Sequence, residues 1–369
     1  MPIQQMMLGA GGTAPVKVQD VFSIDLWTGN ATQRNISNDV NISGEGGMVW
    51  IKSRNANYTH TITDTERGYN KVLYPNNDNG TWMATNEQTL TNHVKSFNSD
   101  GYTIGTHNEV NRNEKTYVGW TFRKHPKFFD IQEATMGADD STYDTTLTHQ
   151  LECDVGMAVF KSRNIYGSQG TNWLVWHKQG CTGANQFWRW NTSDGRQSQN
   201  NTVNYNSSNK TFTFGYPAAQ MQDRMRPGTG AASNVIGYFF ADNNGSGEFG
   251  SGGDEDIIKT GTYTGNGNTA GPSAVNLGWE PQYLMIKRLN AAKYWLLWDT
   301  ARGVVAGAWN NTVNTEPHLK IDENYRENYP SNTDMMEFTS TGFQPRSNDA
   351  GVNQGGNTYI YLAIRKDQS

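Results

Sequence analysis

Apolar residues alternate with polar or small residues in three segments that align with one another without a gap. The segments are 117–124, 235–242 and 359–366. In the first segment Val118, Trp120 and Phe122 share one side of an extended chain, because successive side chains of a strand point to opposite faces. A period of two is typical of a half-buried β-strand, so each segment is predicted to form one.

A second pattern is an apolar run that ends in lysine. It reads Met-Val-Trp-Ile-Lys, Met-Ala-Val-Phe-Lys and Tyr-Leu-Met-Ile-Lys, and it ends at Lys52, Lys161 and Lys287. Short apolar runs with β-branched and aromatic residues predict strands. Each run precedes one of the alternating segments, so the two patterns recur in the same order along the chain.

A third pattern is Asp-Thr-x-Arg-Gly, which follows a short strand-like run. It places Asp64 with Arg67 and, much later, Asp299 with Arg302, while the corresponding middle stretch at 173–180 has lost it. Aspartate accepts backbone N–H bonds in turns, glycine adopts a positive φ, and arginine can bind a carboxylate with two nitrogens. The motif therefore predicts a structural turn rather than a catalytic site.

Several motifs in one fixed order predict three diverged copies of one unit. Each copy would hold an opening strand, a central strand, a strand followed by a turn, a Gly-aromatic strand and a closing strand. This favours an all-β fold of three tandem β-sandwiches, jelly-roll or lectin-like in form. The predicted divisions are a leader at 1–20, sandwiches at 21–125, 128–242 and 256–366, and a flexible, Gly/Ser-rich acidic linker at 243–255.

Composition supports folded, strand-rich domains and excludes several functions. Aromatic residues make up 12% of the chain, including 12 Trp, so each unit can bury large side chains. The net charge is −5 and no Lys/Arg run is present, which argues against nucleic-acid binding. No apolar run approaches the roughly 18 residues that span a bilayer, so membrane insertion is not expected. The two cysteines, Cys153 and Cys181, are expected to be free thiols.

The recurring lysines have two interpretations. A desolvated lysine titrates at lower pH and becomes nucleophilic, so they could be catalytic amines. We favour a structural role, in which each lysine pairs with an acid such as Asp64 or Asp299 on a neighbouring strand and fixes the register. No catalytic residue, cofactor or metal ligand is predicted, and the chain is expected not to be an enzyme.

The aromatic segment at 187–191 is the best candidate for a ligand contact. Trp188 and Trp190 could stack on sugar rings, and Arg189 could supply hydrogen bonds. The competing interpretation, which we weigh more heavily, is that alternating members of this segment fill the core.

A calcium loop is suggested weakly by the linker. Asp242, Asn244 and Ser246 alternate as oxygen ligands do in such loops, but the twelfth position is Gly253 instead of glutamate. The acidic residues at 254–256 could assist, although solvated charge is the simpler interpretation of an acidic linker. Whether calcium binds is left open.

Four phrases of the chain are distinctive. They are Gly-Glu-Gly-Gly-Met-Val-Trp-Ile-Lys at 44–52, Phe-Asn-Ser-Asp-Gly-Tyr-Thr-Ile-Gly at 97–105, Tyr-Val-Gly-Trp-Thr-Phe-Arg-Lys at 117–124 and Tyr-Thr-Gly-Asn-Gly at 263–267. Together they resemble a repeated module of structural proteins in tailed bacteriophages, especially marine and cyanobacterial ones. The leader Ile3-Gln-Gln-Met-Met-Leu-Gly9 is also similar to the start of other virion proteins of such phages.

The resemblance implies a non-enzymatic virion protein: a tail fibre, spike or capsid-attached fibre that assembles in the host cytoplasm. The leader would dock onto other virion proteins, and the sandwiches could attach to a host surface polysaccharide. The alternative is a carbohydrate-binding module or a glycan-cleaving enzyme on a lectin-like sandwich. The position on the virion, the ligand and the oligomeric state, including a homotrimer, are left open.

Overall fold

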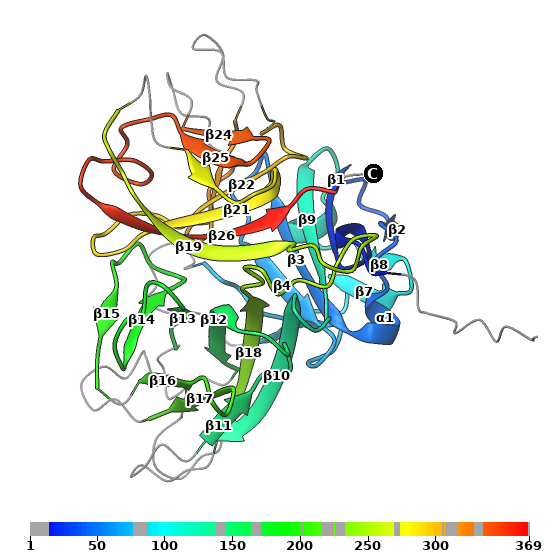
Figure 1. Cartoon of the computed structure of the whole chain (residues 1–369). Coiled ribbons are helices and arrows are strands. Elements are labelled where there is room, and N and C mark those ends of the chain that lie inside the picture. The colour runs from blue at the N-terminus through cyan, green and yellow to red at the C-terminus, as the bar shows by residue number, and fades with distance from the viewer. Residues whose placement is uncertain are drawn as a thin grey trace, which may run out of the picture.

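A computed structural model of the chain describes residues 15–76, 87–136, 145–163, 171–200, 202–215, 225, 233–268, 274–304, 306, 316–327 and 335–367. Strands dominate these residues, and the helices are a 3₁₀ turn η1 (Val18–Asp20), α1 (Ile42–Glu45) and α2 (Asn108–Asn111). The all-β prediction is confirmed (Figure 1). No helix in the described part of the chain is long and apolar enough to cross a membrane.

The first sandwich consists of a large sheet and a small sheet. The large sheet has the order β1-β9-β3-β4, and the small sheet has the order β2-β8-β7, with a β5-β6 ribbon beside them. The bounds are β1 (Phe22–Thr28), β2 (Arg34–Ser37), β3 (Gly47–Ser53), β4 (Thr61–Asp64), β5 (Lys71–Val72), β6 (Gln88–Thr89), β7 (Val94–Asn98), β8 (Gly101–Ile104) and β9 (Thr116–Arg123).

The second sandwich repeats this arrangement. Its large sheet has the order β10-β18-β12-β13-β14-β15, and its small sheet has the order β11-β17-β16. The bounds are β10 (Phe129–Met136), β11 (Thr145–Thr148), β12 (Val155–Ser162), β13 (Leu174–His177), β14 (Gln186–Arg189), β15 (Gln197–Ser198), β16 (Val203–Asn206), β17 (Thr211–Phe214) and β18 (Ser233–Ala241).

The third sandwich has the same connectivity again. Its large sheet has the order β19-β26-β21-β22-β23, and its small sheet has the order β20-β25-β24. The bounds are β19 (Ile258–Thr264), β20 (Val275–Asn276), β21 (Pro281–Arg288), β22 (Leu296–Asp299), β23 (Leu319–Lys320), β24 (Met336–Thr339), β25 (Gly342–Pro345) and β26 (Thr358–Arg365).

The closing strand is central to each large sheet, because it pairs with both the opening strand and the strand that ends in lysine. In the first sandwich Trp120 lies opposite Ile24 on one side and Trp50 on the other. The matching positions on the closing strands of the second and third sandwiches are Tyr238 and Leu362. Register therefore aligns the three large sheets residue by residue.

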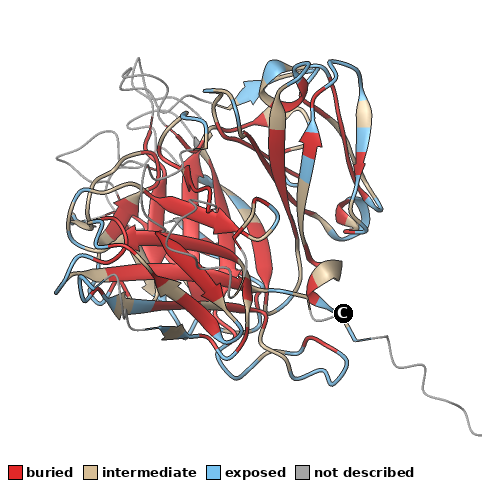
Figure 2. Cartoon of the chain, turned by 90° about the horizontal axis from the view of Figure 1, so that it is seen from above, coloured by how far each residue is buried: buried red, intermediate tan, exposed pale blue. Residues whose placement is uncertain are grey.

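The closing strands are buried on both faces, which corrects the half-buried prediction. On β9 the residues that alternate with Val118, Trp120 and Phe122 are also covered, Tyr117 among them. The physical reason is that each large sheet has two partners. One face packs against its own small sheet, and the other face turns toward the middle of the molecule. Figure 2 shows the large sheets red over most of their length.

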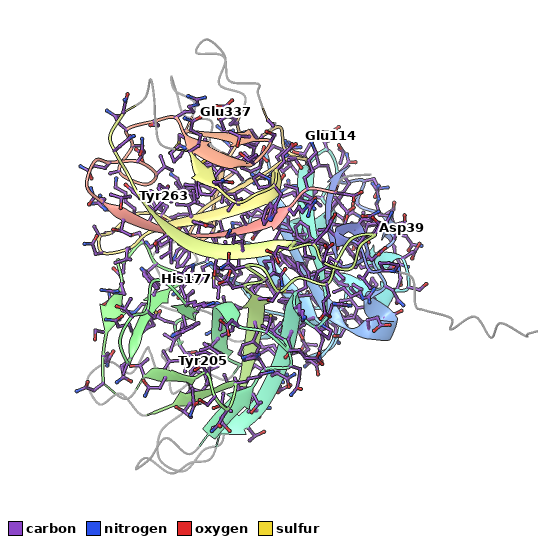
Figure 3. All side chains as sticks on the ribbon, viewed as in Figure 1. Asp39, Glu114, His177, Tyr205, Tyr263 and Glu337 are labelled. Atoms are coloured by element: carbon purple, nitrogen blue, oxygen red, sulfur yellow. The ribbon has the colours of Figure 1, made fainter. Side chains whose placement is uncertain are left out.

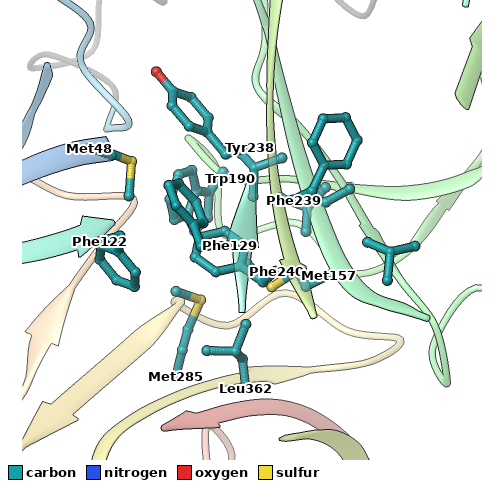
Figure 4. Close-up of a cluster of buried hydrophobic side chains, with 14 of the residues drawn as sticks. Met48, Phe122, Phe129, Met157, Trp190, Tyr238, Phe239, Phe240, Met285 and Leu362 are labelled. Atoms are coloured by element: carbon teal, nitrogen blue, oxygen red, sulfur yellow. The ribbon is translucent and has the colours of Figure 1, made fainter. Parts of the chain in front are cut away.

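A central core joins all three sandwiches. Met48 and Phe122 of the first sandwich, Tyr238 of the second, and Met285 and Leu362 of the third belong to one buried cluster. Figure 4 shows side chains from the three sandwiches converging there. The first and third sandwiches also have separate clusters between their own two sheets, whereas the inner cluster of the second merges with the central core. The three sandwiches thus surround a shared interior instead of standing as a linear stack.

The segment at 243–255 is folded onto the body, which corrects the flexible-linker prediction. Phe249 is fully buried and packs against Phe128, and Gly250 N donates to Val16 O. The Asp256 carboxylate accepts from the backbone N–H groups of Gly245 and Gly247. Composition alone predicted solvation, but one aromatic anchor and these backbone bonds hold the glycines in a compact turn.

Candidate functional site

The three recurring lysines lie at equivalent ends of β3, β12 and β21, and all three are buried. None forms the predicted ion pair with Asp64 or Asp299. Lys52 Nζ donates to the carbonyl oxygens of Ser53 (2.9 Å), Ala56 (3.4 Å) and Asn324 (3.2 Å). The lysines bind backbone carbonyls because the two aspartates are already held by arginines three residues further on.

The other two lysines repeat this binding. Lys161 Nζ donates to the carbonyl and, at 2.8 Å, to the hydroxyl of Thr171. Lys287 Nζ donates to Ser193 O, at 2.8 Å, and to Lys293 O. Burial lowers the pKa of Lys52 and of Lys161 to about 7, and at Lys52 it outweighs the opposing effect of the Glu327 carboxylate. These amines cap orphan carbonyls, and their closest partners contain no electrophile or proton-transfer group.

The Asp-Thr-x-Arg-Gly motif forms the same turn twice. Asp64 Oδ1 accepts from Arg67 N and Oδ2 from Arg67 Nε at 2.6 Å. Asp299 and Arg302 make the same two bonds at 2.9 and 2.6 Å. All four side chains are withdrawn from solvent. The turn is thus built as predicted, and it lies in the interior, where each carboxylate has a further partner in a different sandwich.

At the boundary between the first and second sandwiches, called the 1–2 seam, the turn belongs to a chain of five residues. Arg163 of the second sandwich binds both oxygens of Glu87 at 2.8 Å. Glu87 accepts from Arg67 at 3.2 Å, and Arg67 binds Asp64. The hydroxyl of Tyr238, again from the second sandwich, donates to Asp64 Oδ2 at 2.7 Å. We call this chain of charged and hydrogen-bonded side chains the ionic relay. It crosses the seam twice, from Arg163 to Glu87 and from Tyr238 to Asp64.

The boundary between the first and third sandwiches, the 1–3 seam, has an equivalent relay. Arg54 of the first sandwich donates to Glu327 at 2.7 Å, and Arg302 lies 3.6 Å from the same oxygen. Arg302 binds Asp299, whose Oδ2 accepts from Trp120 Nε1 of the first sandwich at 3.0 Å. Residues at matching positions of the repeats make both relays, with Arg54 equivalent to Arg163 and Arg302 to Arg67. The same set of contacts therefore occurs at two seams.

The boundary between the second and third sandwiches, the 2–3 seam, has lost the ionic relay on both sides. His177 replaces the aspartate, Gly180 replaces the arginine, and Leu362 replaces the aromatic donor. His177 Nε2 instead contacts the carbonyl oxygen of Tyr361 at 3.0 Å. Figure 3 places His177 where the second sandwich meets the third. A buried carboxylate facing leucine would be uncompensated, so the loss of the donor fits the loss of the acid.

A backbone bond and a ring donor repeat at all three seams. Glu87 N donates to Arg163 O, Glu327 N to Arg54 O and Arg196 N to Leu289 O. Just before β4, β13 and β22, one ring nitrogen binds a carbonyl of the neighbouring sandwich. The three pairs are His60 with Lys320 O at 3.1 Å, Trp173 with Tyr74 O at 2.8 Å and Trp295 with Arg189 O at 2.9 Å. The contacts run in one direction around the molecule and close a ring.

The aromatic segment that we considered for ligand contact is core. Trp188 and Trp190 are 0% and 1% exposed, so neither indole face is open to a sugar. Trp190 packs in the centre against Trp50 and Trp173. Arg189 is only partly buried, and it binds Asp194 at 2.8 Å. The ligand prediction for this segment is therefore wrong and the core interpretation is correct, although Phe187, on the opposite side of the alternation, is buried as well.

A surface cavity of about 390 Å³ lies where 242–246 meets the second sandwich. Lys178 Nζ bridges two carboxylates of its lining, donating to Asp154 at 2.7 Å and to Asp242 at 3.0 Å. The lysine ammonium neutralises the carboxylates that calcium would need. The lining residues are Lys127, Glu152, Cys153, Asp154, Lys178, Asp242, Asn243, Asn244 and Ser246.

Metal binding finds no support in the described residues. Among them, no group of three or more His, Cys, Asp or Glu side chains is arranged to hold a metal ion. Cys153 and Cys181 are free thiols there, as predicted, and burial raises the pKa of each to about 12, which keeps them protonated and unreactive. Of the leader at 1–20, predicted to dock onto a virion, residues 1–14 lie outside the described residues, and Val18 of η1 packs into the central core.

Sequence reasoning did not single out the two exposed aromatic residues of the described chain, Tyr69 and Tyr325. Tyr325 is 49% exposed, and Lys320 Nζ lies between its ring, at 5.9 Å, and that of Tyr294, at 4.2 Å. The stretch at 316–327 has no alternation or glycine signal, so nothing in the sequence separates Tyr325 from core aromatics.

Comparison with known families identifies the chain at the level of a domain. A family model described as a domain of unknown function, DUF7483, matches residues 17–367. The chain belongs to this family. The match spans all three sandwiches together, in agreement with the shared interior. No curated protein matches the chain.

Proposed function

We propose that the chain is a non-enzymatic structural protein of a tailed bacteriophage virion, a tail fibre, spike or capsid-attached fibre. The observation that carries the proposal is the ring of three sandwiches closed by equivalent contacts at every seam. The recurring charged residues make contacts inside these seams, as Asp64 does with Arg67 and Tyr238. Such a design favours a rigid building block over an open catalytic cleft.

The ring also bears on oligomeric state. Three related sandwiches in one chain already present a surface with approximate three-fold symmetry, which a homotrimer would otherwise supply. A single chain could therefore occupy a three-fold position on a particle. Light scattering of the purified chain should give the mass of one copy, and a mass of three copies would contradict this part of the proposal.

Particle association tests the main proposal. Mass spectrometry of purified particles of the phage that encodes the chain should find it at a fixed copy number. Deleting residues 2–14, which leaves every described residue in place, should abolish its occupancy while the freed protein stays folded. Absence of the chain from purified particles would contradict the virion location. If the shortened chain were still found on particles at the same copy number, docking through the leader would be contradicted.

Glycan binding is a second candidate function, favoured by the cavity beside 242–246. Carboxylates, amides and lysines around a volume of this size can exchange hydrogen bonds with sugar hydroxyls. Calorimetry with host surface polysaccharide should show binding that Asn244→Ala weakens, whereas Asp100→Asn, on an exposed turn elsewhere, should leave it unchanged. Equal binding by both variants would show that the cavity is not the glycan-binding site. Release of reducing ends would instead favour a glycan-cleaving enzyme.

A further inference from the structure

Two histidines hold the third sandwich from both sides. His60 of the first sandwich binds Lys320 O at 3.1 Å, and His177 of the second sandwich binds Tyr361 O at 3.0 Å. Both acceptors are backbone carbonyls of the third sandwich, and both histidines are fully buried. Across the 1–2 seam the matching ring donor is Trp173, and no described histidine bonds there.

Each histidine is built to be neutral. Because a carbonyl can only accept, Nε2 carries the proton in both rings. The other nitrogen, Nδ1, accepts from Trp50 Nε1 at 3.1 Å in His60, and in His177 it has no partner among the described residues. Protonation would therefore direct a new N–H at the Trp50 donor in one case and into an unpaired buried position in the other. Each result costs free energy.

Charges around the two rings do not compensate for this cost. His60 faces the basic side chains of Lys52 on β3 and Arg302 after β22, and from Lys320 on β23 it meets the backbone carbonyl. Burial, followed by the charge of Lys52, holds the pKa of His60 well below its usual value. Burial lowers the pKa of His177 to about 4.

The groups around His177 are mixed but already paired. Lys178 follows it in the chain and is bound to Asp242, the one carboxylate that acts on the ring. Tyr361 offers its carbonyl, and its own hydroxyl is kept protonated by burial, which raises its pKa to about 12. No described acid is therefore placed to accept from Nδ1 when the ring is charged.

The third sandwich could survive separation, because it has its own core. A separate buried cluster between its two sheets includes Trp298, Phe338 and Tyr359. The folded segment at 243–255 would remain as its covalent tether. The 1–2 seam would persist, because its ring donor is the indole of Trp173, which has no ionisable proton in this pH range.

We propose that residues 256–366 form an acid-released unit: protonation of His60 and His177 undocks the third sandwich while the first and second remain joined. Below the unperturbed histidine pKa of about 6.5, release takes up two protons, so the opening constant rises by up to about 100-fold per pH unit. Release would expose the third sandwich's share of the central core as a new apolar surface.

Three equivalent backbone amides provide matched reporters of the three seams. Arg196 N reports on the 2–3 seam, Glu327 N on the 1–3 seam and Glu87 N on the 1–2 seam. Hydrogen exchange of the full chain, corrected for intrinsic rates, is followed from pH 7 to pH 4. The first two amides should lose protection together, and Glu87 N should keep it until a lower pH. Loss of protection at all three amides at one pH would mean global unfolding and would overturn the proposal.

Variants test whether the two histidines are responsible. Glutamine can donate to a carbonyl and accept from an indole without titrating, so His60→Gln with His177→Gln should shift release of the third sandwich to lower pH by at least one unit. The control pair is His93→Gln with His149→Gln, which are buried away from the seams and should leave the release pH unchanged. An unshifted first pair, or an equal shift in both pairs, would refute the assignment.

Discussion

Tyr238→Phe and Tyr102→Phe make the same chemical change at two fully buried hydroxyls. The hydroxyl of Tyr238 donates to Asp64 across the 1–2 seam at 2.7 Å. The hydroxyl of Tyr102 lies over Gly119 and has no partner among the described residues. The pair therefore separates the hydrogen bond across the seam from the loss of an oxygen atom in the core.

The expected difference follows from the two surroundings. A hydrogen bond to a charged group contributes about 1.5–3 kcal/mol, and Tyr238→Phe should cost an amount near the lower end because Arg67 still binds Asp64. Tyr102→Phe removes a desolvated, unpaired hydroxyl, so it should be neutral within about 0.5 kcal/mol or stabilising. The tyrosine-specific difference should thus exceed about 1 kcal/mol.

Urea unfolding at pH 7, followed by tryptophan fluorescence and circular dichroism, measures both variants. Equal m-values would show that the native and unfolded states expose the same surface in each protein. If Tyr102→Phe destabilises as much as Tyr238→Phe, the contact with Asp64 contributes nothing beyond packing. The relay would then be a consequence of the fold and not a determinant of it.

Three further predictions test other contacts. The free energy of unfolding should rise from pH 7 to pH 9, because folded Lys161, with a pKa of about 7, has released a proton that the unfolded chain still holds. Lys161→Met should reduce this slope by up to about 1.4 kcal/mol per pH unit. An identical slope in the variant would disprove the prediction. Gly119→Ala would place a Cβ 2.2 Å from the Tyr102 hydroxyl, so it should lower the thermal midpoint, with a cost of about 1–3 kcal/mol, and an unchanged midpoint would count against the close packing. A double-mutant cycle on Glu87 and Arg163, measured by urea unfolding, should give a coupling energy above about 1 kcal/mol, whereas a value near zero would make the 1–2 seam pair an ordinary surface contact.

Alternation in the sequence located the strands well, because it depends only on the period of a pleated chain. It placed Trp120 and Phe122 on one face of a closing strand, and that face does point into a core. It could not show that the opposite face is covered too, since burial there depends on a small sheet formed by distant segments. The second face therefore appeared only with the tertiary structure.

The contacts between sandwiches could not be predicted from the sequence for a similar reason. The sequence showed that Asp64 and Lys52 recur, and pairing an acid with a base was the simplest inference. Local geometry decided otherwise, because the turn delivers Arg67 to the aspartate at a separation of three residues, leaving the lysine to bind carbonyls. The partner Tyr238 lies 174 residues away, and no periodic pattern links such positions.

The matched losses at His177 and Leu362 imply that the three copies cannot be exchanged. Replacing the second copy by a duplicate of the first would put the Asp64 carboxylate against Leu362. The carboxylate would keep Arg67 but lose the hydrogen bond that Tyr238 now donates, and a hydrogen bond to a charged group contributes about 1.5–3 kcal/mol. Recombination that exchanged one copy for another would therefore be expected to yield less stable chains. Each copy supplies a residue that only its own neighbour can use, so the order of the copies matters to the folded state.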